Sequence, residues 1–336
     1  MTECRESMEP SQDSVLDGKS VLVTGGTGSF GRHFIKTILR EHTPRRVVVF
    51  SRDELKQYEF QQEIGDDPRI RFFIGDVRDR ERLWRAFDGV EIVVHAAALK
   101  QVPAAEYNPF EAIKTNIHGA QNVIDSALDR DVERVIALST DKASSPINLY
   151  GATKLVSDKL FVDANAYSGT HRTRFAVVRY GNVVGSRGSV VPHFQRLAPT
   201  GVFPITDERM TRFWITLDQG VQFVIRMTAA MQGGELFVPK IPSMRVVDLA
   251  AAVSPQARIE IVGIRPGEKL HEEMIGVDDA RRTRDAGDFY VMQPDVDWWN
   301  GAAWQDAELV APGFRYTSDA NSQWLSVEDL RRMIDA

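Results

Sequence analysis

The hydrophobic pattern of the chain alternates short β-branched runs with longer amphipathic segments. Buried strands are predicted where valine, isoleucine and phenylalanine cluster, over residues 20–26, 45–51, 70–76, 91–98, 134–140 and 174–181. Between the first two runs, residues 31–42 place Phe34, Ile35 and Ile38 on one face of a helix, and residues 108–128 repeat this pattern over a longer span. Repeated strand–helix alternation predicts an α/β fold with a doubly wound parallel sheet.

The pattern changes after Gly181, where glycine, proline and serine become frequent and the predicted elements shorten. We therefore expect a Rossmann-like domain followed by a smaller C-terminal substrate lobe. The predicted division is a polar N-terminal tail (1–18), a dinucleotide-binding domain (19–181 plus 217–240), the substrate lobe (182–216 and 241–290) and a C-terminal tail (291–336). Residues 217–240 are predicted to return to the main sheet, and the tail to end in a short helix.

Composition and charge narrow the class of protein. The 336 residues are 43% hydrophobic and 26% charged, as in soluble globular proteins, and the net charge of -6 argues against a general binder of nucleic acid or anionic membranes. The single cysteine, Cys4, excludes a disulfide framework within the chain. No apolar run approaches the roughly 18 residues of a membrane span, and the first residues lack a signal-like core. We expect a cytoplasmic protein that binds neither membrane nor nucleic acid.

The glycine spacing after the first predicted strand indicates a phosphate-binding loop. Glycine lets the backbone turn sharply and approach a pyrophosphate, while a helix N-terminus supplies free N–H groups and the positive end of a dipole. Because these glycines lie between a strand and a helix, they predict dinucleotide binding. The residues expected to contact the cofactor there are Thr24, Gly25, Gly28, Ser29, Phe30 and Gly31.

The ends of the next strands bear on which dinucleotide is bound. The second strand is followed by Arg52, with Lys56 one turn further on, and this cationic pair suits a 2′-phosphate and favours NADP. Asp53 is a carboxylate of the kind that binds a ribose 2′-hydroxyl, so NAD remains open. Further cofactor contacts are expected from Ser51, from Asp76 near the adenine, and from Val77, Ala96 and Ala97.

Residues 138–154, LSTDKASSPINLYGATK, gather polar groups at the end of the fifth strand, where parallel sheets bind ligands. Tyr150 and Lys154 are four residues apart, so both can face a cleft from one helix. A phenol normally titrates near pH ~10, and a nearby ammonium and nicotinamide cation would lower that pKa, making a base for a sugar hydroxyl. With the glycine loop upstream, this Tyr-x-x-x-Lys pattern indicates the extended short-chain dehydrogenase/reductase superfamily.

Asp141 and Lys142 supply an acid and an amine that an enzyme needs only if it does more than oxidise the C4 hydroxyl of a sugar. An oxidised C4 makes the C5 proton acidic, so one group can remove that proton while the other protonates the departing C6 hydroxyl. The pair therefore favours elimination of water beside a transient ketone, followed by hydride return. The alternative interpretation is an exposed ion pair in a loop.

The chain resembles the inverting UDP-N-acetylglucosamine 4,6-dehydratases, soluble enzymes that begin pseudaminic acid synthesis for flagellin glycosylation. The resemblance extends over nearly the whole length, except the first 15 or so residues and residues 296–310. It rests on the strings TGGTGSFG, FSRDELKQ, GDVRD, HAAALKQVP, STDKA, RYGNVVGSRGSV, MTRFWITL and RPGEKLHEEM. The segment AVSPQARIE is shorter than the corresponding region of that family. This difference concerns the residues expected near the uridine of the substrate.

The resemblance implies a role for each site residue. Lys142 would be the C5 base, Asp141 the acid that assists water loss, and Tyr150 the group acting at C4 with support from Lys154. Thr140 would bind the sugar. The remaining substrate contacts implied are Lys100, Asn182, Arg187, Arg212, Arg265 and Glu268, the last two at the diphosphate and ribose of UDP. UDP-N-acetylglucosamine would be the substrate, NADP the cofactor, no metal would be needed, and we expect a homo-oligomer.

Two related enzymes and one non-catalytic class are the alternatives. Retaining dehydratases resemble the chain around STDKA but typically have methionine where this chain has Tyr150. A UDP-hexose 4-epimerase would use Tyr150 without needing Asp141 and Lys142. An NADP-sensing regulator on the same fold would need none of these groups together. The sequence therefore predicts an inverting dehydratase.

Overall fold

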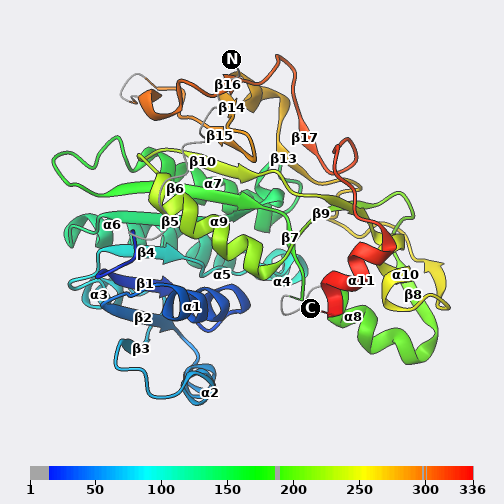
Figure 1. Ribbon diagram of the computed structural model, residues 1–336, viewed down its shortest axis with the longest axis horizontal. Coiled ribbons are helices and arrows are strands. Elements are labelled where there is room, and N and C mark those ends of the chain that lie inside the picture. The colour runs from blue at the N-terminus through cyan, green and yellow to red at the C-terminus, as the bar shows by residue number, and fades with distance from the viewer. Residues whose placement is uncertain (1–14, 186–189, 297–298, 300, 336) are drawn as a thin grey trace, which may run out of the picture.

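The computed structural model describes residues 15–185, 190–296, 299 and 301–335. At its centre lies a 10-stranded sheet in the order β16-β14-β15-β10-β6-β5-β4-β1-β2-β3 (Figure 1). The six predicted strands lie next to one another and are parallel: β1 (Ser20–Thr24), β2 (Arg46–Ser51), β3 (Ile70–Ile74), β4 (Ile92–His95), β5 (Arg134–Thr140) and β6 (Arg174–Tyr180). Their order, 3-2-1-4-5-6, is that of a doubly wound dinucleotide-binding fold, which confirms the predicted fold class.

Helices cover the sheet because each connection between parallel strands must cross over one of its faces. On one side, α1 (Ser29–Glu41) packs against α9 (Leu217–Ala230), and on the other α3 (Arg80–Ala86), α6 (Gly119–Asp129) and α7 (Leu149–Asp163) lie side by side (Figure 1). Phe34, Ile35 and Ile38 of α1 are fully buried, as their spacing predicts. A shorter α2 (Glu54–Ile64) follows β2.

The helix predicted over residues 108–128 is not continuous. After α4 (Val102–Tyr107), it consists of α5 (Pro109–Ile113), one π-helical turn (Lys114–His118) and α6. The turn places Asn116 against the loop after β4, where its amide accepts from the Leu99 N–H and donates to the Leu99 carbonyl and the Thr153 hydroxyl. A π-turn inside a helix often marks a functional site, and this one fixes the loop beside the helix that carries Tyr150.

A second, smaller core lies beyond the carboxyl ends of β5 and β6. Its strands are β7 (Asn182–Val183), β9 (Thr211–Ile215) and β11 (Ser243–Arg245) in one sheet, and β8 (Val202–Ile205) and β12 (Arg258–Ile261) in another. Its helices are α8 (Val190–Leu197), α10 (Val246–Val253) and α11 (Val327–Asp335). Phe194, Phe203 and Trp214 are buried in this core.

The main sheet extends further along the chain than the predicted division into domains. β10 (Leu236–Pro239) pairs in parallel with β6, and β15 (Phe289–Met292), β14 (Thr283–Asp285) and β16 (Glu308–Leu309) continue the sheet in antiparallel pairs. Residues 283–292, which the prediction assigned to the lobe and the tail, thus belong to this sheet. Edge-to-face packing of Phe237, Phe289 and Trp304 stabilises the extension.

One short ladder links the lobe to the site. β13 (Glu273–Ile275) pairs with β17 (Tyr316–Thr317) and lies against the turn that follows β5.

Among the described helices, none is long and apolar enough to cross a membrane.

Candidate active site

The predicted phosphate loop connects β1 to α1. Gly25 has a φ of +67°, and a Cβ at Gly25 would lie 2.9 Å from the Ala97 nitrogen. A Cβ at Gly31 would lie 2.6 Å from the Gly25 carbonyl oxygen, so only glycine permits this close packing. The helix begins at Ser29 after Gly28, which has no side chain to cap it. This backbone cradle at a helix N-terminus fits the pyrophosphate of a dinucleotide.

Below this loop, Thr24 and Ala97 belong to one hydrogen-bonded group. The Thr24 hydroxyl lies 2.8 Å from Nδ1 of His95 and accepts from the Ala97 N–H at 3.3 Å. Burial, together with the Lys154 ammonium, lowers the pKa of His95 to about 3, so its imidazole is neutral. The sequence did not single out His95 as part of this hydrogen-bonded group, because a lone histidine in a buried run gives no distinct signal.

At the end of β2, the two predicted phosphate-binding cations lie on the surface. Arg52 Nη1 is 3.6 Å from Asp76 Oδ2, and Lys56 Nζ is 2.7 Å from Asp53 Oδ2. About half of each basic side chain is exposed, at 51% and 45%. Both cations are therefore accessible to a ligand at the carboxyl edge of the sheet.

The other predicted cofactor residues lie nearby. Ser51 ends β2, where its hydroxyl accepts from the Gln57 amide at 3.0 Å. Val77 is buried, and Ala96 and Ala97 are half-buried just after β4.

The segment singled out after β5 folds into a compact acid–base group. Thr140 ends β5, Asp141–Ala143 form a single 3₁₀ turn, and Asn148 caps α7 by accepting from the Gly151 N–H at 2.8 Å. A Cβ at Gly151 would lie 2.1 Å from the Lys142 carbonyl oxygen. The glycine of Tyr-Gly-x-x-Lys therefore lets α7 pack directly against the turn that carries Asp141 and Lys142.

Asp141 and Lys142 form a buried ion pair, which excludes the exposed loop pair as an interpretation. Lys142 Nζ donates to Asp141 Oδ1 at 3.1 Å, and the Thr140 hydroxyl donates to the same oxygen at 2.9 Å. The Asp141 side chain is 1% exposed and the Lys142 side chain 24%. Burial raises the pKa of Asp141 against the opposing effect of Lys142, and the two carboxylates beside Lys142 raise its pKa despite burial.

Tyr150 and Lys154 both lie on α7, and both side chains are buried. Burial raises the pKa of Tyr150 to about 12, although the Lys142 ammonium and a hydrogen bond with Thr140 act in the opposite direction. The expected lowering of this pKa is therefore not produced by the charges of the polypeptide. Burial also lowers the pKa of Lys154, against the effect of Asp158.

Glu272 is a member of this group that the sequence did not single out. Its Oε1 lies 3.2 Å from Lys142 Nζ and 3.7 Å from Arg212 Nε, and its side chain is 3% exposed. The string RPGEKLHEEM contains two adjacent glutamates, and no local pattern tells which one turns toward Lys142. Hydrogen bonds between the Glu272 backbone and Ser318, next to the pairing of β13 with β17, hold Glu272 in that orientation.

The predicted substrate residues that the structure describes lie around the same edge of the sheet. Arg212 is anchored to the Thr211 and Leu270 carbonyls and so belongs to the Lys142 group rather than to the surface. Arg265 and Glu268 form an exposed turn, which a hydrogen bond from Asn148 to the Gly267 carbonyl at 2.8 Å ties to the start of α7. Lys100 is exposed after β4, Asn182 begins β7, and Arg187 lies outside the described residues.

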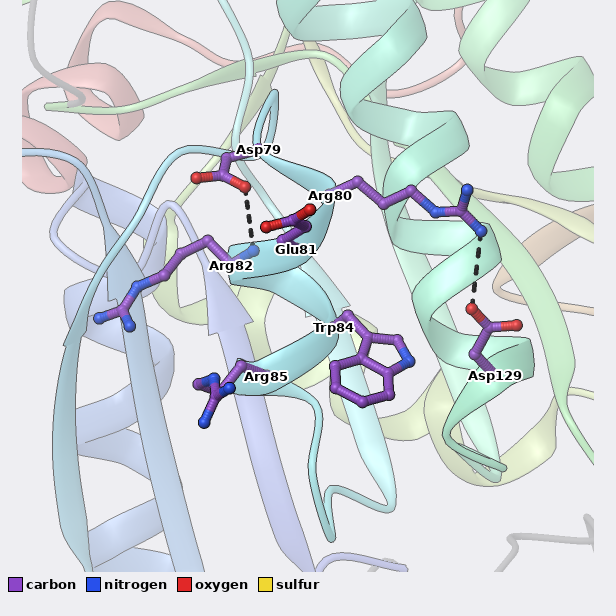
Figure 2. A pocket seen from close by; sticks show the side chains of 7 residues that line it. All are labelled: Asp79, Arg80, Glu81, Arg82, Trp84, Arg85 and Asp129. Atoms are coloured by element: carbon purple, nitrogen blue, oxygen red, sulfur yellow. Dashed lines mark hydrogen bonds and ion pairs between the residues drawn. The ribbon is translucent and has the colours of Figure 1, made fainter.

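A surface hollow of about 630 Å³ lies elsewhere, beside α3 (Figure 2). It is lined by Asp79, Arg80, Glu81, Arg82, Trp84, Arg85 and Asp129. None of the predicted site residues lines it. Within the described part of the chain, no group of three or more histidine, cysteine, aspartate or glutamate side chains could hold a metal ion.

Comparison with known proteins shows the family to which the chain belongs. The model of the family described as "Polysaccharide biosynthesis protein" matches residues 21–294. A Campylobacter jejuni protein named UDP-N-acetylglucosamine 4,6-dehydratase (inverting) is 53% identical over 330 residues, which cover 96% of this chain and 98% of that protein. A Rickettsia canadensis protein named UDP-glucose 4-epimerase is 36% identical over 326 residues, covering 94% and 95% of the two chains.

Solved structures show the same fold. Pen from Bacillus thuringiensis superposes with a TM-score of 0.87 at 37% identity, covering 95% of this chain and 98% of that one. DesIV, a dTDP-glucose 4,6-dehydratase from Streptomyces venezuelae solved with NAD and TYD bound, has a TM-score of 0.70 at 25% identity, covering 84% and 94%. The chain therefore belongs to the polysaccharide biosynthesis protein family and is similar, over nearly its whole length, to an inverting UDP-N-acetylglucosamine 4,6-dehydratase.

Proposed function

We propose that the protein is a UDP-N-acetylglucosamine 4,6-dehydratase that inverts C5. Its product would be UDP-2-acetamido-2,6-dideoxy-β-L-arabino-hexos-4-ulose. The observation that carries this proposal is the buried Asp141–Lys142 pair, which lies on the turn packed against the helix that presents Tyr150. The 53% identity to a relative of that name supports the choice of substrate.

A bound nicotinamide cofactor would supply the redox chemistry of this reaction, which is hydride removal from C4 and hydride return to C6. The glycine cradle fits its pyrophosphate, and DesIV was solved with NAD bound. We further propose that this chain prefers NADP. The exposed Arg52 and Lys56 at the end of β2 support this preference, because charge-assisted bonds to a 2′-phosphate are stronger than neutral ones.

The site residues divide into groups that act at C4 and groups that act at C5 and C6. Tyr150 would accept the proton of the C4 hydroxyl, with Lys154 supporting it. The polypeptide alone keeps the Tyr150 phenol protonated near neutral pH, so the cofactor cation must supply the additional lowering of its pKa.

The Asp141–Lys142 pair would carry out the elimination. The active form is the one in which Asp141 holds the proton and Lys142 is neutral. Lys142 then takes the C5 proton while Asp141 gives its proton to the departing C6 hydroxyl, which leaves as water. Burial raises the pKa of Asp141, which favours its protonated form, while the two neighbouring carboxylates raise the pKa of Lys142. The active form therefore requires a proton to pass from Lys142 to Asp141 within the pair.

Two groups of residues would hold the substrate. Thr140, Lys100 and Asn182 would contact the sugar, since they lie at the ends of β5 and β4 and at the start of β7. Arg265 and Glu268 would meet the diphosphate and ribose, from a turn tied to the N-terminus of α7. Arg187 and Arg212 are further candidates for phosphate contacts, although the buried contacts of Arg212 favour a role beside Glu272.

The second candidate is a 4-epimerase, which the 36% identical relative keeps under consideration. The two activities are separated by incubating the protein and NADP with UDP-N-acetylglucosamine and weighing the product by mass spectrometry. A dehydratase gives a product that has lost one water, whereas an epimerase gives an isomer of unchanged mass. Recovery of only unchanged mass, with a measurable change at C4, would refute the dehydratase.

A further inference from the structure

The environment of Glu272 gives this carboxylate a part in the chemistry. Its Oε1 lies 3.2 Å from the Lys142 amine, the same amine that contacts Asp141 at 3.1 Å. The Lys142 nitrogen is thus held between two carboxylates that are each almost completely buried. Glu272 Oε2 is also buried and has no hydrogen-bond partner among the described residues.

The backbone around Glu272 is fixed to the catalytic turn. The Glu272 N–H donates to the Ser318 hydroxyl at 2.9 Å, and the Glu272 carbonyl accepts from the Ser318 N–H at 2.8 Å. The next residue, Glu273, accepts from the Ser144 and Ser145 hydroxyls at 3.1 and 2.6 Å. Glu272 therefore reaches Lys142 from the position directly before β13, a strand that is itself bonded to the segment carrying Lys142, so the contact is geometrically constrained.

The charges around Glu272 determine which carboxyl group can take a proton. Arg212, on β9, has its Nε 3.7 Å from Glu272 Oε1, and an arginine stays charged at any pH a protein tolerates. Lys142 and Arg212 lower the pKa of Glu272 against the effect of burial, so this group remains an anion. At Asp141, burial outweighs the attraction of Lys142, so Asp141 is the carboxyl group of the two that can accept a proton.

We propose that Glu272 is a positioning residue for proton transfer at C5: it clamps the Lys142 amine beside Asp141, and its charge stabilises the ammonium that forms on Lys142. This inference rests on the proposed function. When Lys142 takes the C5 proton, the C5–H bond breaks, an N–H bond forms, and a positive charge develops on Nζ between Glu272 and Asp141. Oxidation at C4 develops no charge on Lys142, so Glu272 acts on elimination and not on that earlier step.

The test compares Glu272→Gln with Glu273→Gln. The first substitution keeps the shape of the side chain and removes its charge. The second makes the same change on the next residue, where the new amide keeps an oxygen that can still accept from the Ser144 and Ser145 hydroxyls. We expect Glu272→Gln to lower kcat at least tenfold, with KM within about threefold, because the charge acts on a developing ammonium. In a single turnover, the reduced nicotinamide should form at the wild-type rate and then persist.

The pH profile gives a readout that a merely structural role would not move. The charged and titratable groups that face Glu272 are Lys142 and Asp141 on the turn, Arg212 on β9 and Lys269 before β13. Removing the Glu272 charge lowers the pKa of both Asp141 and Lys142, since an anion nearby favours protonation of each. Both limbs of the kcat profile should therefore move about one unit toward lower pH. Glu273→Gln should leave both limbs where they are.

Three results would overturn the inference. They are an unshifted profile with unchanged kcat in Glu272→Gln, equal effects of the two substitutions, or equal slowing of nicotinamide reduction and elimination. Should Glu272→Gln not fold, Glu272→Asp withdraws the carboxylate by one methylene, and a wild-type kcat in that variant also refutes the clamp. A wild-type protein that forms no dehydrated product defeats the proposed function instead, so the two failures are distinct.

Discussion

Replacing Lys142 with alanine removes the cation that lies between two buried carboxylates. If Lys142 is the C5 base, loss of the amine should slow formation of the dehydrated product by about 10²- to 10⁴-fold, the usual contribution of a positioned general base. Binding of the nicotinamide cofactor should persist, because Lys142 lies apart from the glycine loop on a separate turn. Solvent deuterium should also fail to enter C5.

The same substitution has a cost in stability that depends on pH. Asp141 keeps only the Thr140 hydroxyl, and Glu272 keeps Arg212. Removing one partner of a buried pair typically costs about 3–5 kcal/mol, and the 24% exposure of Lys142 places the expected loss near the lower end, about 3 kcal/mol.

The sign of the pH dependence follows from Asp141. A carboxyl group whose pKa is raised by folding contributes stability below its unfolded-state pKa, and that contribution is lost as pH rises through the folded-state pKa. Without Lys142 the folded-state pKa of Asp141 rises further, so the loss extends to higher pH. Urea unfolding at about pH 5 and about pH 8 should show the larger deficit at the higher pH.

Lys19→Ala is the matched control. Lys19 also contacts two carboxylates, Glu133 at 2.9 Å and Glu91 at 3.6 Å, but it precedes β1 at the opposite edge of the sheet. It should retain full dehydration and lose at most about 1 kcal/mol, as a partly exposed pair does. A fall in rate of less than about tenfold in Lys142→Ala would exclude Lys142 as the base.

The remaining predictions concern the cofactor. Replacing Arg52 and Lys56 together with alanine should weaken binding of NADP much more than that of NAD, measured by calorimetric titration, and equal losses would refute the 2′-phosphate assignment. Gly31→Ala should weaken binding of either dinucleotide at least tenfold, because its Cβ would lie 2.6 Å from the Gly25 carbonyl oxygen. The control is Gly220→Ala in α9, where the new Cβ would have open space. That variant should bind the dinucleotides normally and be more stable by up to about 1 kcal/mol. Normal binding by Gly31→Ala would refute the glycine cradle.

Local patterns predicted the parts of this protein whose structure is decided locally. The β-branched runs predicted β1 to β6, and the glycine spacing predicted the turn before α1, because strand burial and sharp turns depend on adjacent residues. The spacing of Tyr150 and Lys154 likewise placed both side chains on α7.

Contacts between distant segments could not be predicted in this way. Glu272 meets Lys142 only because β13 pairs with β17 and packs against the turn after β5. The run Phe289–Met292 carries no mark of its pairing partner. The prediction placed these residues in the lobe and the tail, and the structure pairs them with β10 in the main sheet. The π-turn that holds Asn116 was not predicted either, because residue composition gives one extra residue in a helical turn no signature of its own.

The most direct test of the proposed reaction is a proton NMR spectrum of the product formed from UDP-N-acetylglucosamine in D₂O, recorded at the earliest measurable time. We predict a 4-keto-6-deoxy sugar with the L-arabino configuration, deuterium at C5, and no net accumulation of reduced nicotinamide. Early recording matters because slow epimerisation at C5 would mix the two configurations. A first product with the D-xylo configuration would contradict inversion, and a C4 epimer that retains its C6 hydroxyl would contradict dehydration itself.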